Sequence, residues 1–439
     1  MTEDFLQYIW KYRLFNTPEL LTTSGEALSV FHPGQHNMGG GPDFLNAKLR
    51  IGKETWVGNV EVHIRSSDWH RHKHTQDEHY KNVILHVVFE NDIAIELGQP
   101  GDLPVLVLAD YIIAHQFETW QRWMKAQTWI PCQPQIHLMD ELTWMGWKER
   151  LTIERLEEKS KDVLAELERC RGDWNETFYR RLARNFGFKA NAEAMEMLAA
   201  AIPQSVLGRH KSDPFQVEAL LFGTAGFLED DFRDDYPQEL KKEFEFLSKK
   251  FSLTPMSSAA WNFGRLRPAN FPSIRIAQFA ALVCKSEHLF SKILETENLH
   301  DIFSMFDVEA HEYWKSHFRF PLADEPPPTT IPGKIPDERR LGWGSIENII
   351  INTASTVLFT YGRQRDDAMV DRALKLLEMC HPESNRIIDN WKTLGVKIST
   401  AADSQATLQL YNRYCIEKRC LSCQVGLKLL KNQGNEKLY

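Results

Sequence analysis

Long apolar runs are what this sequence most clearly lacks. None of its apolar stretches approaches the roughly 20 residues that a membrane-spanning helix needs. Its beginning, Met1–Trp10, carries Glu3 and Asp4 and has no basic segment ahead of an apolar core, so the pattern predicts no secretory signal. From these absences we expect a cytoplasmic protein with no membrane partner.

Positive charge is also scarce. The chain has 52 lysines and arginines against 60 aspartates and glutamates, which gives a formal net charge of −8. A molecule with this balance has no general attraction for nucleic acid. A nucleic-acid-binding function therefore needs a local basic path.

The chain also contains few cysteines. The seven cysteines form an odd set, and three of them fall within Cys415–Cys423. This distribution is not that of a secreted disulfide framework, and it indicates either a metal site or free thiols.

The length and the texture of the chain predict more than one domain. A chain of 439 residues exceeds what one small core can organise. Strand and helix signals alternate at the start of the chain in the coarse order α-β-β-β-α-β. We expect helices over Asp4–Leu14 and His74–Lys81, and strands over Ala27–His32, Asp43–Ile51, Thr55–Ile64, Val83–Glu90 and Val105–Ala109.

From about Tyr111 onward the pattern becomes helical, with the amphipathic stretch Trp144–Arg169 as its clearest example. The fold class is therefore α+β, with a mainly α-helical region and a Cys-rich tail after the mixed core. We expect four segments: a mixed α/β domain at 1–110, a helical domain at 111–325, a proline-rich loop or linker at 326–340, and a helical C-terminal region at 341–439.

Two acidic residues in the expected hairpin carry the clearest chemistry. Asp43 follows Gly41-Pro42, and Glu61 lies in the run Trp56-Val57-Gly58-Asn59-Val60-Glu61-Val62-His63. Adjacent strands can bring two carboxylates together, and carboxylate oxygens are what Mg²⁺ prefers. Glu61 and His63 are two positions apart, so they share one face of their strand. Phosphodiester hydrolysis uses such a metal to polarise phosphate and to activate water.

A purely structural interpretation remains open at this stage, in which Asp43 fixes a turn and Glu61 is an exposed strand residue. The apolar neighbours Val60, Val62 and Ile64 weigh against it, because they indicate that the strand is buried on at least one face. A buried carboxylate without a partner is costly, and a metal ion is a good neutralising partner.

The order of elements and these motifs resemble the PD-(D/E)XK nuclease superfamily. Gln76-Asp77-Glu78-His79-Tyr80 has the Gln-x-x-x-Tyr spacing found on the next helix of RecB-like and lambda-exonuclease-like members. The resemblance implies a restriction-endonuclease-like core and a nuclease that cuts DNA or RNA with Mg²⁺ or Mn²⁺. It implies metal binding by Asp43 and Glu61, and a buttressing or DNA-contacting role for Gln76 and Tyr80.

Further candidate residues follow from the same resemblance. His32 or His36 matches an upstream histidine that some RecB-like members use as an extra ligand. The family's catalytic lysine falls on His63, which could act as a metal ligand or a general base, and Lys48 could supply the missing positive charge. The chain as a whole is also similar to a bacterial family of uncharacterised proteins that share Gly-Pro-Asp-Phe and Trp-x-Gly-x-Val-Glu-x-His.

Two other functions remain open. The missing lysine favours a catalytically inactive nucleic-acid-binding or scaffold protein on a degenerate nuclease core. A histidine cluster favours a zinc-dependent phosphoesterase, although no His-Glu-x-x-His spacing is present. The cluster comprises His63, His70, His72, His74, His79 and His86. Arg65, Arg71 and Lys73 are placed to contact phosphates in any of these proteins.

The C-terminal cysteines predict a second, structural site. Cys415-x4-Cys420-x2-Cys423 can supply three ligands from one short segment. The fourth ligand could be Cys380 or His381. Zinc is the expected metal, and an iron–sulfur cluster is the alternative, because some RecB-like nucleases resemble this chain in carrying Cys-bound clusters.

Overall fold

The chain divides into two compact units, and each is described by itself. The computed structural model describes residues 1–15, 20–95, 103–286, 288–324 and 339–432. One unit comprises Met1–Trp147 together with Leu410–Tyr439, and the other comprises Lys148–Gln409. This division differs from the four expected segments, because the first unit extends beyond residue 110 and includes the C-terminal tail. Apart from Arg339 and Arg340, the expected proline-rich loop at 326–340 lies outside the described residues.

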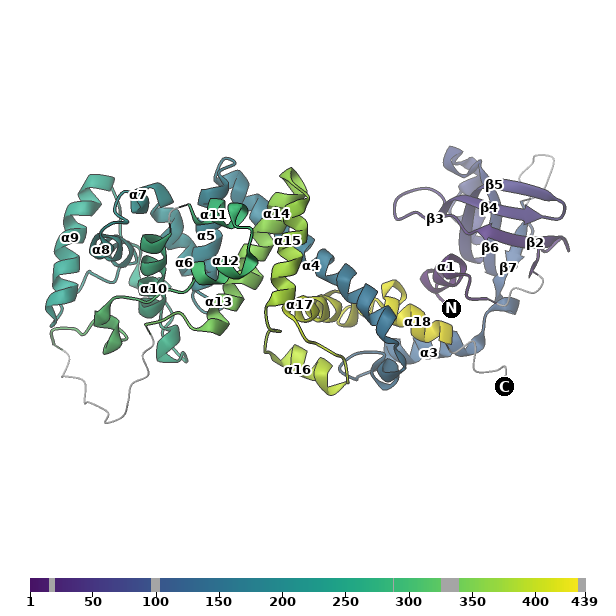
Figure 1. Cartoon of the computed structure of the whole chain (residues 1–439). Helices are drawn as coiled ribbons and strands as arrows, with labels where there is room; N and C mark the ends of the chain where they lie inside the picture. Colours follow the sequence, from purple (N-terminus) through teal and green to yellow (C-terminus); the bar gives the residue numbers. More distant parts are fainter. Residues whose placement is uncertain (16–19, 96–102, 287, 325–338, 433–439) are drawn as a thin grey trace. The chain divides into compact units, whose positions relative to one another are not determined.

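The first unit is built on one mixed sheet. Its strands run in the order β1-β2-β4-β5-β6-β7, with β3 paired to β4. Strand β4 is antiparallel to both of its neighbours, β2 and β5, whereas β6 is parallel to β5 and β7 is parallel to β6 (Figure 1). The bounds are β1 Leu20–Leu21, β2 Ala27–His32, β3 Gln35–His36, β4 Phe44–Ile51, β5 Glu54–Arg65, β6 Val83–Glu90 and β7 Val105–Val107.

Sequence patterns explain the middle of this sheet. The β4–β5 hairpin turns at Gly52, whose φ of +59° suits glycine. Gly58 lets β5 approach β6, since a Cβ there would meet Cγ2 of Ile84 at 2.4 Å. Strand β6 is buried continuously over 83–88, as its apolar run predicts for a strand with two covered faces. The expected hairpin and the expected strand are therefore confirmed.

Helix α1, Glu3–Tyr12, contacts β5. The Thr2 side chain caps its first turn by accepting from the Phe5 amide, and Arg13 ends it in the left-handed conformation. Phe5, Ile9 and Trp10 are buried, which agrees with the helical spacing of the apolar residues.

The connection between β5 and β6 departs from the expected helix over His74–Lys81. The structure has a short helix α2, Asp68–Arg71, followed by two 3₁₀ turns at His74–Gln76 and Glu78–Tyr80. Asp77 separates these turns in an extended conformation, and its side chain accepts from the His79 amide. The prediction of one helix was wrong because aspartate competes with helical hydrogen bonding by capping its own backbone.

The remainder of the first unit is helical and includes the C-terminal tail. Its helices are α3 Ala114–Lys125, the start of α4 Glu141–Arg169, and α18 Gln424–Asn432, which lies beside α3 (Figure 1). The Gln116 amide donates to the Leu430 carbonyl at 3.2 Å. Lys418 Nζ donates to the Met124 carbonyl at 2.5 Å and to the Ala126 carbonyl at 3.2 Å. These bonds attach the tail to the end of α3.

In its described residues the second unit is built of helices, with two isolated β-bridges. After α4 come α5 Trp174–Phe186, α6 Ala192–Ala201, α7 Gln204–Gly208, α8 Pro214–Thr224, α9 Asp235–Phe251, α10 Pro272–Lys285, α11 Leu289–Glu295, α12 Leu299–Met305, α13 Trp343–Ile349, α14 Ser355–Arg365, α15 Ala368–Met379, α16 Arg386–Thr393 and α17 Ala401–Leu410. One apolar core joins the helices from α4 to α15 and the first residues of α17. Within the described ranges, no helix is both long enough and apolar enough to cross a membrane.

Candidate active site on strand β5

Asp43 and Glu61 hold each other in place through the backbone. The Asp43 amide donates to Glu61 Oε2 at 3.1 Å, and the Val62 amide donates to Asp43 Oδ2 at 3.0 Å. Asp43 immediately precedes β4 and Glu61 lies in β5, so the hairpin register creates this reciprocal pair. The structure therefore brings together the two carboxylates that the sequence predicts.

Two imidazoles converge on the other oxygen of Glu61. The Nε2 atoms of His63 and His74 each lie 3.3 Å from Glu61 Oε1. The His74 Nε2 atom is buried and has no hydrogen-bond partner. The two observations agree if the 3.3 Å contact is close but misaligned for a hydrogen bond. A cation bound between Glu61 Oε1 and the Nε2 atoms of His63 and His74 would be a partner for all three atoms.

A third imidazole completes the group. His63 Nε2 lies 3.1 Å from Nδ1 of His72, and the ligand atoms of His63, His72 and His74 all lie within 4.8 Å of one another. Four donors around one ion at about 2.1 Å stand about 3.4 Å apart in a tetrahedron. The separations of 3.1–3.3 Å around His63 and Glu61 thus fit one transition-metal ion.

Aromatic side chains cover the group. The Tyr80 ring stacks on His74 at 3.7 Å between centroids, and Trp69 meets His74 edge-on. His86, on β6, lies 2.9 Å from Nδ1 of His63 through its Nε2 atom. His86 is fully buried. Its hydrogen bond to Nδ1 orients the His63 ring, in the way that a residue of the outer coordination shell orients a metal ligand.

Burial and neighbouring negative charge both raise the pKa values of Asp43 and Glu61. Burial is the largest cause that raises the pKa of Glu61 to about 9, and the neighbouring Asp43 adds to it. Burial also raises the pKa of Asp43 to about 6, against the lowering effect of the Val62 amide. A positive ion at this position would remove the charge repulsion and favour both ionised forms.

The same burial keeps the inner imidazoles neutral. It lowers the pKa of His63 to about 3, that of His74 to about 4 and that of His86 to about 3, with neighbouring histidines adding to each effect. A neutral imidazole has the free nitrogen lone pair that a metal needs. The chemistry of the donor set therefore fits a metal ion.

Helix α1 contributes two side chains that sequence reasoning missed. Gln7 hydrogen-bonds to the Asp43 carboxylate, and the charge of Glu3 acts on both Asp43 and Glu61. Gln7 also lies 3.4 Å from Nε2 of His36, which stacks on Phe44. Glu3 and Gln7 are four positions apart on one helix face. This spacing is the signal that could have found them.

Other predicted site residues lie away from the carboxylates. Lys48 is exposed and pairs with Val57, four residues from Glu61 along β5, or about 13 Å at the strand rise. It is therefore not brought to the site, which corrects the expectation that it replaces the missing lysine. Gln76 is exposed at the end of the turn that begins with His74, and His32 is exposed at the end of β2.

The expected phosphate-contacting residues are exposed near the site. Arg65 ends β5 and pairs with Glu90 at 3.3 Å, and Arg71 pairs with Asp68 at 3.0 Å. Lys73 is exposed in the left-handed conformation directly before His74. The exposed Arg65–Glu90 pair is weak, so Arg65 can exchange its partner for phosphate, whereas the partner of Arg71 is the buried Asp68.

The cysteines are grouped differently from the expectation. Cys132, Cys415, Cys420 and Cys423 line one small cavity of the first unit. Cys380 belongs to the second unit, where it packs in the helical core and its carbonyl accepts from the Ala401 amide. His381 also lies there and bonds to Glu347 at 2.7 Å. The fourth cysteine beside the C-terminal three is thus Cys132, not Cys380.

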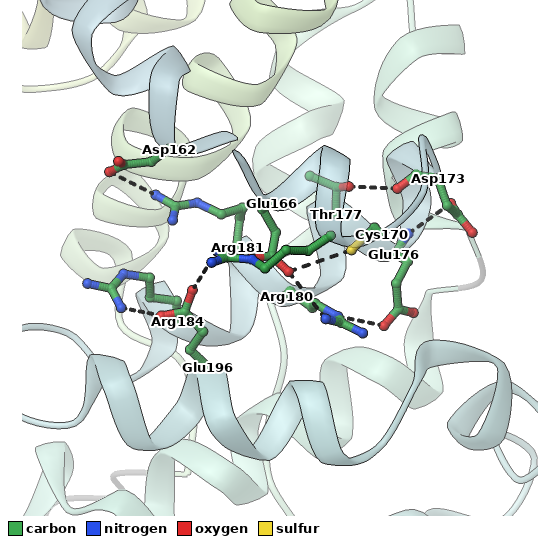
Figure 2. Close-up of polar contacts among 11 residues, drawn as sticks. Asp162, Glu166, Cys170, Asp173, Glu176, Thr177, Arg180, Arg181, Arg184 and Glu196 are labelled. Carbon is green, nitrogen blue, oxygen red and sulfur yellow. Dashed lines mark hydrogen bonds and ion pairs between the residues drawn. The ribbon is translucent and has the colours of Figure 1, made fainter. Parts of the chain in front are cut away.

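The second unit has its own polar centre beside a cavity of about 650 Å³. Arg180 on α5 bonds to Glu166 of α4 at 3.3 Å and to Glu176 at 2.9 Å (Figure 2). Arg184 pairs with Glu196 of α6, and Arg181 lies 4.0 Å from Asp162. Because these α5 arginines are already paired within the protein, we assign the network to stability rather than to anion binding.

Comparison with known proteins gives a family. No curated protein and no solved structure matches the chain. A family model described as "Protein of unknown function (DUF2851)" matches residues 3–386, which is most of the chain. The chain therefore belongs to the DUF2851 family.

Proposed function

We propose that the first unit is a metal-dependent nuclease that hydrolyses phosphodiester bonds in DNA or RNA. One observation carries the proposal: the Glu61 carboxylate and the imidazoles of His63 and His74 converge at 3.3 Å beside Asp43. Carboxylate and imidazole donors at this spacing suit a divalent metal, and phosphodiester hydrolysis is a reaction that such metals promote.

The donor set favours Mn²⁺ over Mg²⁺. Mg²⁺ takes oxygen ligands and keeps several waters, whereas imidazole nitrogen suits transition metals. Asp43 and Glu61 alone would suit either ion. His63 and His74 at Glu61 Oε1 shift the preference towards Mn²⁺.

The topology supports a PD-(D/E)XK core. Three antiparallel strands, β2, β4 and β5, are followed by a crossover to β6, which is parallel to β5. Asp43 stands at the start of β4 and Glu61 on β5, the positions that the resemblance assigns to metal ligands. His63 takes the place of the family's lysine as a ligand rather than as a free cation.

Each residue has a specific role in this proposal. A bound metal supplies the positive charge that polarises the phosphate and activates water. Asp43, Glu61, His63 and His74 hold it, and Tyr80 orients His74 by stacking. Arg65, Arg71 and Lys73 bind the phosphate backbone and supply the local basic path that the net charge of −8 does not.

A zinc-dependent phosphoesterase is the second candidate, and one specific observation favours it. His63, His72 and His74 form a three-imidazole group, and three protein ligands with an open position are typical of catalytic zinc. In this protein the substrate would be a small phosphoester. The inactive nucleic-acid-binding alternative predicts binding without turnover.

One set of assays separates these functions. Purified full-length chain is incubated with Mn²⁺, Mg²⁺ or Zn²⁺ and with labelled single- and double-stranded DNA, RNA and a chromogenic phosphomonoester. We expect Mn²⁺-dependent cutting of nucleic acid that Asp43→Ala and Glu61→Ala abolish. His79→Ala is the matched control, because His79 is an exposed histidine of the same connection that pairs with Asp77. Cutting that survives both acidic substitutions contradicts the proposal, and turnover of the monoester alone favours the zinc enzyme.

A further inference from the structure

Four cysteines from distant parts of the chain meet at one place in the first unit. Cys132 follows α3, and Cys415, Cys420 and Cys423 lie in the tail. Pro131, Tyr414 and Gly426 complete the lining of the small cavity that these cysteines share. Bringing Cys132 beside a segment that begins at Cys415 needs a specific fold, so the grouping is not a consequence of sequence proximity.

The surrounding backbone is built around this cavity. Lys418 lies between Cys415 and Cys420 and bonds to the carbonyls that end α3, which fixes the cysteine segment near Cys132. Gly426 allows α18 to pass directly over Cys420, since a Cβ at this position would meet the Cys420 carbonyl at 2.1 Å. The loop between Cys415 and α18 is therefore held closely on both sides.

The cysteines are enclosed and unbridged. Cys132, Cys420 and Cys423 are buried, with exposures of 7–8%, and none of the four forms a disulfide. A cluster of thiols in an enclosed position is typical of a metal site, because thiolate sulfur is a strong ligand for zinc and for iron–sulfur clusters.

We propose that Cys132, Cys415, Cys420 and Cys423 bind an iron–sulfur cluster. Four cysteine thiolates are the usual ligand set of such clusters, and Cys-x4-Cys-x2-Cys is one of their known spacings. The cluster binds the tail to the segment after α3 and has a structural role. This site is separate from the carboxylate–histidine site and does not depend on the proposed nuclease activity.

Metal and sulfide analysis of the purified chain tests the proposal. Full-length protein is produced in iron-replete cells, purified without oxygen, and assayed for iron, acid-labile sulfide and zinc. We expect iron and sulfide in equal amounts, brown colour, and visible absorption that dithionite partly bleaches. Bound zinc without sulfide, or no metal at all in folded protein, overturns the proposal. This measurement uses the unsubstituted chain, so it does not depend on whether a variant folds.

Matched cysteine variants test the ligand set. Cys132→Ser is expected to lose most of the iron and sulfide, as is Cys420→Ser. Cys380→Ser and Cys170→Ser are expected to keep both, because Cys380 and Cys170 lie in the second unit. Far-ultraviolet circular dichroism of each variant shows whether the helices remain. Full cluster content in Cys132→Ser, or its loss in Cys380→Ser, contradicts the assignment.

Discussion

The Nε2 atom of His63 lies 3.3 Å from Oε1 of Glu61, and the Nε2 atom of His74 lies at the same distance from that oxygen. The opposite oxygen of Glu61 is held by the Asp43 amide. Glu61 is therefore anchored by the backbone at one oxygen, while the other faces two imidazoles that burial keeps neutral. This arrangement leads to specific expectations for metal binding, stability and pH.

Replacing Glu61 should weaken metal binding strongly. Glu61→Gln keeps the size of the side chain and removes its charge, so we expect Mn²⁺ affinity to fall at least about 100-fold, given that even outer-shell changes cost about 10–100-fold. Isothermal titration with Mn²⁺ measures the effect. Glu90→Gln is the matched control, because Glu90 is exposed and forms an ion pair with Arg65. An unchanged affinity in Glu61→Gln contradicts the account.

Replacing His74 should change metal selectivity more than overall fold. His74→Ala removes a nitrogen donor and leaves the two carboxylates, so the ratio of Mn²⁺ to Mg²⁺ affinity should fall. His79→Ala should leave this ratio unchanged, since His79 is exposed on the next turn. Competition titrations with both ions measure the ratio. If both variants behave alike, His74 is not a ligand.

Stability without metal should fall as pH rises above neutrality. The folded-state pKa of Glu61 is raised from 4.5 to about 9, so the folded chain binds more protons than the unfolded chain across this window. The free energy of unfolding then decreases with pH. The lowered pKa values of His63 and His74 act below pH 6.5. Burial lowers the pKa of Lys159 to about 7, and this lysine acts in the opposite direction between pH 7 and 9, so the difference between wild type and Glu61→Gln isolates the carboxylate.

Urea unfolding of metal-free protein across that pH range measures this dependence. Wild type should lose more stability with rising pH than Glu61→Gln does. Added Mn²⁺ should flatten the wild-type curve, because the ion binds the ionised carboxylate. Parallel curves for the two metal-free proteins would show that Glu61 does not titrate as described.

Two carboxylates of the arginine network in the second unit, Glu166 and Asp162, should contribute different amounts to the free energy of unfolding. Glu166 is 3% exposed and accepts bonds from Arg169 and Arg180. Glu166→Ala removes these charge-assisted bonds while Arg180 keeps Glu176, so it should cost about 2 kcal/mol. Asp162 is 75% exposed and lies 4.0 Å from Arg181, so Asp162→Ala should cost less than about 0.5 kcal/mol. Chemical denaturation of both variants provides the measurement. Equal costs would contradict a structural role for Glu166.

Sequence reasoning succeeded where the chemistry lies within one regular element. Helix α1, the β4–β5 hairpin and strand β6 follow from periodicity and from a glycine turn. Glu61 and His63 share one face because a strand repeats every two residues, and their contact is observed at 3.3 Å.

Residues joined by irregular backbone could not be placed in this way. His74 reaches Glu61 because the connection after β5 folds back through a left-handed Lys73 and a 3₁₀ turn. No periodicity predicts such a path. Cys132 meets the C-terminal cysteines through the packing of α18 on α3 and the Lys418 bonds to the end of α3, and long-range contacts of this kind leave no local pattern. From the sequence alone, Cys380 was therefore expected as the fourth ligand where the structure has Cys132.

Anomalous X-ray diffraction from Mn²⁺-soaked crystals tests the central claim most directly. The account predicts one ion within about 2.3 Å of Glu61 Oε1 and of a nitrogen of His63, with His74 and Asp43 as further ligands or as partners of its waters. An ion bound elsewhere, or no anomalous peak beside Glu61 at saturating Mn²⁺, would contradict it.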